Sequence, residues 1–326
     1  MNSAPLTVWC NAHFADAPLA ELRARLRNHM LVFPSSLHKS NLAAGGADPS
    51  LAEADVALGQ PDPQQILQLP RLKWVHLTTA GYTRYDREDL RQAFRQRGAI
   101  LTNSSAVYAE PCAEHVFAMM LSMARRLPQC IDDQRASRPW HAAEHRERSH
   151  LLVGQTVLIL GFGAIASRLV ELLAPFRMNI TAVRRRPLRN EPCRVLPTDQ
   201  TDALLPRADH VVNILPANSA TEGFLTRHRL GLLKPSAFLY NIGRGTTVHQ
   251  PALMETLQQR RIAGAYLDVT DPEPLPPDHP LWSAPNCYIT PHTAGGQPDE
   301  FHQLVRHFAD NLDRFAAGKE LRDRVA

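Results

Sequence analysis

The chain has 326 residues, of which 44% are hydrophobic and 21% are charged, and its formal net charge is +4. That length predicts about two domains, and the composition is that of a globular protein that can bury a core. No run of about 18 apolar residues is present, which excludes a membrane-spanning helix, and the arginines are too scattered for a nucleic-acid surface.

The cysteines and the start of the chain bear on the compartment. The five cysteines are odd in number and lack C-x-x-C spacing, so we predict reduced thiols in a cytoplasmic protein. They are Cys10, Cys112, Cys130, Cys193 and Cys287. The first residues lack the basic and apolar segments of a signal peptide, which favours the same compartment.

The first hundred residues alternate short apolar runs with helical spacing, which is typical of a parallel α/β sheet. Strands are predicted at residues 6–10, 54–58, 74–77 and 99–102. A helix is predicted at 19–26, and residues 34–50 are predicted as loop. After the strand at 74–77, Thr79, Ala80 and Gly81 form a turn whose backbone N–H groups can hold a small anion. An ordinary strand-to-helix turn is the alternative.

Residues 110–127 predict a helix that is apolar on nearly every side, with Pro111 near its start. We expect it to be buried against its own domain and against a second subunit. The polar arm that follows contains His141-Ala-Ala-Glu-His145, which matches a zinc-binding pattern. A zinc site also needs a third ligand and a supporting fold, so we predict a solvated arm and no metal.

The most informative turn follows a predicted strand at 156–160. It reads Gly161-Phe162-Gly163-Ala164-Ile165-Ala166 and opens an amphipathic helix, which is the setting that a G-x-G-x-x-G/A dinucleotide motif requires. Gly161 allows the tight turn, and Gly163 lets the backbone approach a pyrophosphate at the helix N-terminus. A glycine turn without a ligand is the alternative.

The end of the next predicted strand, at 179–183, bears on the choice of cofactor. NAD sites usually have an acidic residue there that binds the ribose 2′-hydroxyl. This chain has Arg184, Arg185 and Arg186 instead, and these cations would attract a 2′-phosphate. The sequence therefore predicts that NADP(H) is preferred and that NAD(H) is possible.

Three buried strands are predicted in a row at 237–243, 264–270 and 287–291, after a further strand at 210–215. Arg244, Glu273 and His292 follow the three strands. Ligands of open parallel sheets bind outside the carboxyl ends of the strands, so we expect these side chains to converge. A plain turn, a solvated loop residue and a strand cap are the separate alternatives. A terminal helix at 299–317 is expected to pack on the first domain.

These motifs resemble those of the D-2-hydroxyacid dehydrogenase family, nearest to its glyoxylate/hydroxypyruvate reductase branch. The resemblance is strongest from Asn103 to Gly296 and looser before residue 100. The motifs that carry it are residues 113–116, 161–166, 213–216, 241–245, 267–275, 279–282 and 291–295.

The resemblance implies an α/β fold with two Rossmann-like, doubly wound parallel-sheet lobes and a cleft between them. The dinucleotide-binding lobe, residues 104–295, is inserted into a flavodoxin-like substrate-binding lobe made of residues 1–103 and 296–326. The family also implies a homodimer built on the helix and arm at about 110–150. Trp140 on that arm is a candidate to reach the partner's site.

Matched motif to motif, Arg244, Glu273 and His292 fall on the family's catalytic positions, and Asp268 falls near the nicotinamide. The implied cofactor-binding residues are Gly161, Phe162, Gly163, Ala164, Ile165, Arg184, Arg185, Arg186, Leu215, Pro216, Ile242, Gly243, Arg244, Asp268, His292, Ala294 and Gly295. The implied substrate-binding residues are Thr79, Ala80, Gly81, Arg244 and His292.

The resulting prediction is NAD(P)H-dependent reduction of a small 2-keto acid to the D-2-hydroxy acid. His292 would give the proton, Glu273 would fix its tautomer and stabilise the imidazolium, and Arg244 would hold the substrate carboxylate. Two alternatives stay open: a non-catalytic dinucleotide sensor, and a relative that oxidises formate or phosphite.

Overall fold

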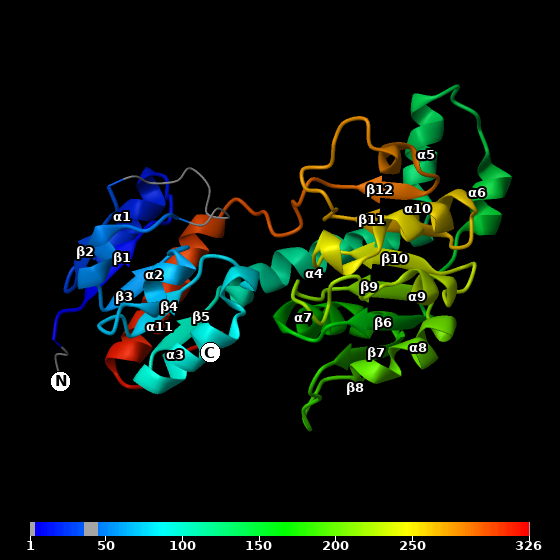
Figure 1. Cartoon of the computed structure of the whole chain (residues 1–326). Coiled ribbons are helices and arrows are strands. Elements are labelled where there is room, and N and C mark those ends of the chain that lie inside the picture. The colour runs from blue at the N-terminus through cyan, green and yellow to red at the C-terminus, as the bar shows by residue number, and fades with distance from the viewer. Residues whose placement is uncertain (1–3, 36–44, 326) are drawn as a thin grey trace. The chain divides into compact units, whose positions relative to one another are not determined.

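We analysed a computed structural model of the chain, which describes residues 4–35 and 45–325. The loop predicted at 34–50 therefore lies in part outside the described residues. The chain divides into two compact units (Figure 1), one made of Met1–Tyr108 with Gln297–Ala326 and the other of Ala109–Gly296.

The first unit contains a parallel sheet with the strand order β2-β1-β3-β4-β5, an order found in flavodoxin-like folds. Its strands are β1 (Thr7–Cys10), β2 (Met30–Val32), β3 (Val56–Leu58), β4 (Trp74–His76) and β5 (Ile100–Thr102). The predicted α/β class is confirmed, and four of these strands match the predicted runs. The sequence analysis missed β2, whose side chains are only partly buried.

Helices α1 (Asp16–Arg25), α2 (Pro63–Leu67), α3 (Glu88–Arg97) and α11 (Glu300–Ala316) belong to the same unit. The apolar stripe of α11 is buried in a core with Val8, Leu22 and Trp74. The ring of Phe308 stacks on Trp74 with centroids 5.2 Å apart. Residues from the first part of the chain and from α11 thus form one hydrophobic core.

The second unit contains a seven-stranded sheet with the order β12-β11-β10-β9-β6-β7-β8, and every pairing is parallel. Its strands are β6 (Thr156–Leu160), β7 (Asn179–Arg184), β8 (Arg194–Pro197), β9 (His210–Asn213), β10 (Phe238–Asn241), β11 (Gly264–Leu267) and β12 (Cys287–Ile289). The sequence analysis missed only β8 among these strands, at the sheet edge. The remaining helices are α4 (Ser105–Ala124), α5 (Leu127–Arg135), α6 (Ala142–Arg148), α7 (Ala164–Leu173), α8 (Thr201–Leu204), α9 (Arg227–Gly231) and α10 (Gln250–Gln258).

The long helix α4 begins earlier than predicted, so Pro111 lies inside it. Its first N–H groups find acceptors outside the helix: Ser105 N donates to Asn103 Oδ1 at 3.2 Å, and Ala106 N donates to Asp323 Oδ2 at 2.8 Å. Pro111 has no N–H for the carbonyl of Val107, and Gln297 Nε2 supplies a donor to that oxygen at 3.3 Å. None of the helices in the described parts of the chain is long and apolar enough to cross a membrane.

Candidate functional site

The carboxyl edge of the second sheet carries the three predicted catalytic residues. Strands β10, β11 and β12 are parallel neighbours (Figure 1), and their last residues lie in register, Asn241 beside Leu267 and Leu267 beside Ile289. The chain leaves all three strands at the same edge because they are parallel. Arg244, Glu273 and His292 lie in the segments that follow.

His292 and Glu273 form a hydrogen-bonded pair. The Nδ1 of His292 lies 2.5 Å from Glu273 Oε1, and both side chains are partly exposed, at 34% and 40%. Among the described residues, the other ring nitrogen, Nε2, makes no hydrogen bond. The pair therefore has one nitrogen oriented by a carboxylate and the other available to a ligand.

The loop that carries His292 is held by Asp268, which is almost completely buried. Its backbone oxygen accepts the N–H of His292 at 2.8 Å, which supports His292 at the left-handed φ of 54°. The Asp268 carboxylate accepts the N–H of Thr293 at 2.9 Å and that of Ala294 at 3.1 Å. Asp268 thus holds the loop that carries His292, a role that the sequence motif did not reveal.

A chain of side-chain hydrogen bonds continues behind Asp268. The hydroxyl of Thr290 donates to Asp268 at 2.6 Å, and the buried Tyr266 hydroxyl lies 2.5 Å from Thr290 Oγ1. The same Tyr266 oxygen bonds Nε2 of His115 on α4. Burial raises the pKa of Tyr266, so this hydroxyl stays protonated. The sequence analysis missed Tyr266 because it reads as one more apolar strand residue.

The backbone at Arg244 is held by buried polar side chains at the strand ends. Its carbonyl oxygen accepts from Asn241 Nδ2 at 3.2 Å and from the hydroxyl of Thr247 at 2.6 Å. Asn213, at the end of β9, donates to Asn241 at 3.0 Å and to Thr247 at 2.7 Å. A fully satisfied buried network of this kind specifies one conformation.

The Arg244 guanidinium is suited to an anionic ligand. It is only partly exposed and donates to the Gly243 carbonyl oxygen at 2.6 Å. Burial lowers the pKa of Arg244 while the charge of Glu273 opposes this shift, which places the two groups within electrostatic reach. Among the described residues no carboxylate forms an ion pair with Arg244 within 4.0 Å. A half-buried cation without a paired acid favours a carboxylate ligand.

The glycine turn after β6 fits the pyrophosphate of a dinucleotide. Gly161 has a φ of 92°, and a Cβ there would lie 3.1 Å from the Ile214 carbonyl oxygen. Gly163 precedes α7, and a Cβ on it would meet nothing within 4 Å, so the helix N-terminus is open to a ligand. Phe162 and Ala166 are buried, whereas Ala164 and Ile165 in the first turn are partly exposed.

The other predicted cofactor residues lie in segments that leave the sheet at this same edge. They are Leu215 and Pro216 after β9, Ile242 and Gly243 after β10, and Ala294 and Gly295 after β12. A Cβ on Gly243 would lie 2.6 Å from the Leu215 carbonyl oxygen, so the loops after β9 and β10 are in close contact.

The three arginines at the end of β7 and just after it lie beside the glycine turn, because the N–H of Gly161 donates to the Val183 carbonyl oxygen at 2.9 Å. Arg185 and Arg186 are exposed and form no ion pair within the described chain. Arg184 is different: its Nη1 lies 2.9 Å from Glu191 Oε1. The sequence analysis found no acid at the strand end and missed Glu191, which the following loop folds back to this point.

The predicted anion-binding turn lies in the first unit, after β4. The hydroxyl of Thr79 donates to the Gly81 carbonyl oxygen at 2.6 Å, and Asn103 Nδ2 donates to that of Ala80 at 2.6 Å. Gln60 Nε2 donates to Thr79 at 3.1 Å. The N–H groups of Ala80 and Gly81 form no hydrogen bond with other described residues. The turn is thus fixed by side chains while two donors stay available.

The zinc-like pentapeptide lies on α6, where His145 has other partners. Its Nε2 lies 2.7 Å from Asp133, and Arg126 Nε donates to its Nδ1 at 3.2 Å. No group of three or more His, Cys, Asp or Glu side chains suited to a metal occurs in the parts of the chain that the structure describes.

The chain is similar to known proteins over nearly its whole length. A family model described as the NAD binding domain of D-isomer specific 2-hydroxyacid dehydrogenases matches residues 117–294. Glyoxylate/hydroxypyruvate reductase B of Pectobacterium carotovorum is 30% identical over 311 residues, which are 92% of each protein.

Solved structures agree with this similarity. The NADPH-dependent glyoxylate/hydroxypyruvate reductase of Sinorhizobium meliloti, solved with NADP and malonate, matches with a TM-score of 0.73 and 25% identity, over 99% of this chain and 97% of that one. A D-isomer specific 2-hydroxyacid dehydrogenase of Xanthobacter autotrophicus, solved with NADPH and MES, has the same fold, with a TM-score of 0.80, 24% identity and coverage of 100% and 98%. The chain therefore belongs to the D-isomer specific 2-hydroxyacid dehydrogenase family.

Proposed function

We propose that this chain reduces a small 2-keto acid, of the glyoxylate or hydroxypyruvate type, to the D-2-hydroxy acid with NADPH as the preferred cofactor. Membership of the family makes it an NAD(P)-dependent oxidoreductase. The observation that carries the proposal is the His292–Glu273 pair, at the sheet edge that also bears Arg244 and the glycine turn.

His292 is the proposed proton donor. A bound nicotinamide supplies the hydride, and the carbonyl oxygen of the substrate then needs a proton. Imidazolium can give this proton from Nε2 because Nδ1 is bonded to Glu273. The carboxylate of Glu273 stabilises the charged ring before transfer and fixes the tautomer after it.

Arg244 is the proposed ligand of the substrate carboxylate. A guanidinium presents a planar pair of N–H groups that matches a carboxylate, and Arg244 has no competing acid within ion-pair distance among the described residues. Its charge also polarises the neighbouring keto group. In the first unit, the N–H groups of Ala80 and Gly81 are separately proposed as donors to a carboxylate, since the turn leaves both unbonded within the described chain.

The preference for NADP(H) rests on charge. Arg185 and Arg186 are exposed beside the glycine turn, where a 2′-phosphate would gain from two unpaired cations. The NADP complex of the Sinorhizobium meliloti reductase gives the same expectation by similarity. NAD(H) remains a proposed second cofactor.

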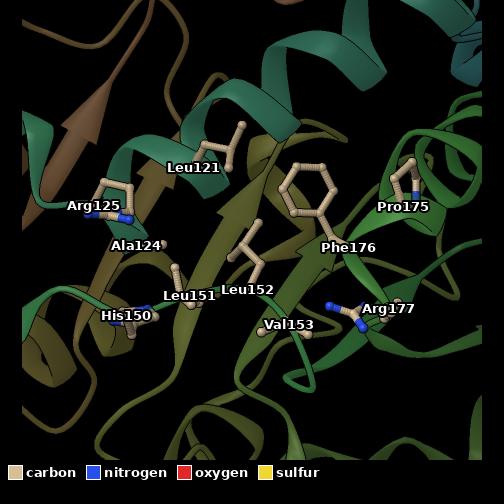
Figure 2. A pocket seen from close by; sticks show the side chains of 10 residues that line it. All are labelled: Leu121, Ala124, Arg125, His150, Leu151, Leu152, Val153, Pro175, Phe176 and Arg177. Atoms are coloured by element: carbon tan, nitrogen blue, oxygen red, sulfur yellow. The ribbon is translucent and has the colours of Figure 1, made fainter.

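A homodimer is proposed from the apolar surface around α5 and the arm. The exposed apolar side chains there are Leu127, Ile131, Trp140, Leu151 and Val153, and Trp140 is 94% exposed. Leu151 and Val153 also line a hollow of about 310 Å³, and Leu121, Leu152 and Phe176 point into it (Figure 2). An apolar surface of this kind favours a protein partner, and a second copy of the chain is the proposed one.

The free thiols suit the reducing cytoplasm, the proposed compartment.

The direct test is a substrate panel at fixed NADPH, with NADH in parallel and with formate and phosphite assayed in the oxidative direction. We expect reduction of glyoxylate and hydroxypyruvate, a higher kcat/KM with NADPH than with NADH, and the D-enantiomer as the product of a chiral keto acid. No turnover of any keto acid would contradict the proposed reaction, and a higher kcat/KM with NADH would contradict the cofactor preference.

A further inference from the structure

The loop between β7 and β8 brings an acid to the place where the sequence has only cations. Glu191 follows Arg184 in sequence after residues 185–190, and the loop folds back so that the two side chains meet. Its Oε1 accepts from Arg184 Nη1 at 2.9 Å and from the N–H of Leu188 at 3.1 Å. The Glu191 side chain is only 9% exposed, and that of Arg184 is 31% exposed. The ion pair is therefore built into the loop and is not a mobile surface contact.

The pair divides the arginines into two kinds. Arg184 already has a carboxylate partner, whereas Arg185 and Arg186 have none within the described chain. The loop also keeps the Glu191 carboxylate close to the thiol of Cys193. Burial and the charge of Glu191 together raise the pKa of this thiol to about 11. An anion that approaches Arg184 thus meets one positive and one negative group, whose fields largely cancel.

We propose that Glu191 is a specificity-determining residue that limits the affinity for a 2′-phosphorylated dinucleotide by occupying Arg184 and opposing the phosphate charge. The inference rests on the proposed dinucleotide site beside the glycine turn. Arg185 and Arg186 then attract the 2′-phosphate of NADPH. Glu191 repels this phosphate but does not repel NADH, because NADH lacks it. Glu191 thereby keeps the two cofactors closer in affinity than an all-arginine strand end would.

The test measures dissociation constants of NADPH and NADH by the fluorescence of the bound cofactor, without any keto acid. Glu191→Gln keeps an acceptor for Leu188 N and removes the charge. It should tighten NADPH binding by about three- to tenfold at low ionic strength and leave NADH within about twofold. Raising the salt concentration should shrink the gain. An unchanged or weaker NADPH affinity would overturn the proposal.

A double-mutant cycle separates the ion pair from general disturbance of the loop. Arg184→Ala leaves the Glu191 charge unpaired and should weaken NADPH binding by about three- to tenfold, whereas the double variant lacks both charges and should bind NADPH within about twofold of the wild type. A double variant that binds NADPH as weakly as Arg184→Ala would contradict the assigned role of Glu191. Glu255→Gln, which breaks the exposed pair with Arg227 elsewhere on the second unit, is the matched control and should leave both affinities unchanged.

The outcomes distinguish this inference from the proposed reaction. A protein that reduces no keto acid but shows the predicted cycle would refute the reaction and keep the role of Glu191. A protein that reduces glyoxylate with NADPH, but binds NADPH equally well with and without the Glu191 charge, would do the reverse. Thermal melting of each variant confirms that the fold is retained.

Discussion

The two ends of the second sheet differ in how their proposed functional side chains are held. After β9, β10 and β11 the chain is fixed by Asn213, Asn241, Thr247 and Asp268, all of which are buried. Just after β7 the proposed cofactor-binding groups are the exposed Arg185 and Arg186, while the acid Glu191 pairs with Arg184. Buried, fully bonded networks hold a geometry, whereas exposed charges act at longer range and are screened by salt. We therefore propose that chemistry takes place at the end of the sheet with the buried networks, called the rigid end, and that cofactor selection takes place at the end with the exposed charges, called the adjustable end.

Apart from substitutions of His292, the largest effect is expected from Arg244→Lys. Lysine keeps the charge but loses the planar pair of donors, so kcat/KM for the keto acid should fall by roughly 10² or more. Steady-state kinetics at saturating NADPH measure this, with the NADPH dissociation constant as the control. Near-normal kcat/KM would show that position and charge alone suffice at this end.

Glu273→Gln should lower kcat by about 10- to 100-fold. Glutamine keeps an oxygen that can accept from Nδ1 of His292 but loses the negative charge that faces the ring. Steady-state kinetics at saturating NADPH measure the change, with the NADPH dissociation constant as the control. An unchanged kcat would mean that the carboxylate of Glu273 does not assist His292.

Much of this arrangement can be predicted from local sequence. The apolar runs of β10, β11 and β12 mark buried parallel strands, and the glycine turn is recognisable because a strand precedes it and a helix follows. The edge strands β2 and β8 were missed because their side chains are only partly buried and carry a weak pattern.

Other features depend on contacts between distant residues. The true start of α4 is held by Asn103, which is nearby in sequence, and by Asp323 at the far end of the chain. Glu191 and Tyr266 likewise acquire their partners only when loops and helices pack. No periodicity encodes these contacts, and the hydrogen-bond chain through Tyr266 looks in sequence like ordinary strand core.

Asp268→Asn tests whether the rigid end is held as described. Asparagine would replace Oδ2, which accepts the N–H of Ala294, by an amide nitrogen that faces this N–H. Its own buried amide hydrogens would then lack an acceptor, which should cost about 1–3 kcal/mol of unfolding free energy. Chemical denaturation measures the loss, and kcat should fall with it because the His292 loop is released. Normal stability with normal kcat would contradict the positioning role of Asp268.

The smallest effects are expected at the adjustable end. Arg185→Ser and Arg186→Ser should each weaken NADPH binding by roughly three- to tenfold, with NADH within about twofold, since each removes one exposed cation. Fluorescence titration at two salt concentrations measures this. Losses that are equal for both cofactors would show that the arginines do not select for the 2′-phosphate.

We propose that His292, oriented by Glu273, protonates a keto acid at this sheet edge. The most direct test of this role compares His292→Ala with the wild type in NADPH-dependent glyoxylate reduction, with a substitution of the exposed His228 in the same unit, His228→Ala, as the matched control. We predict that His292→Ala lowers kcat by about 10² or more while NADPH still binds and the control keeps full activity. Full activity of His292→Ala would contradict the proposed role of His292.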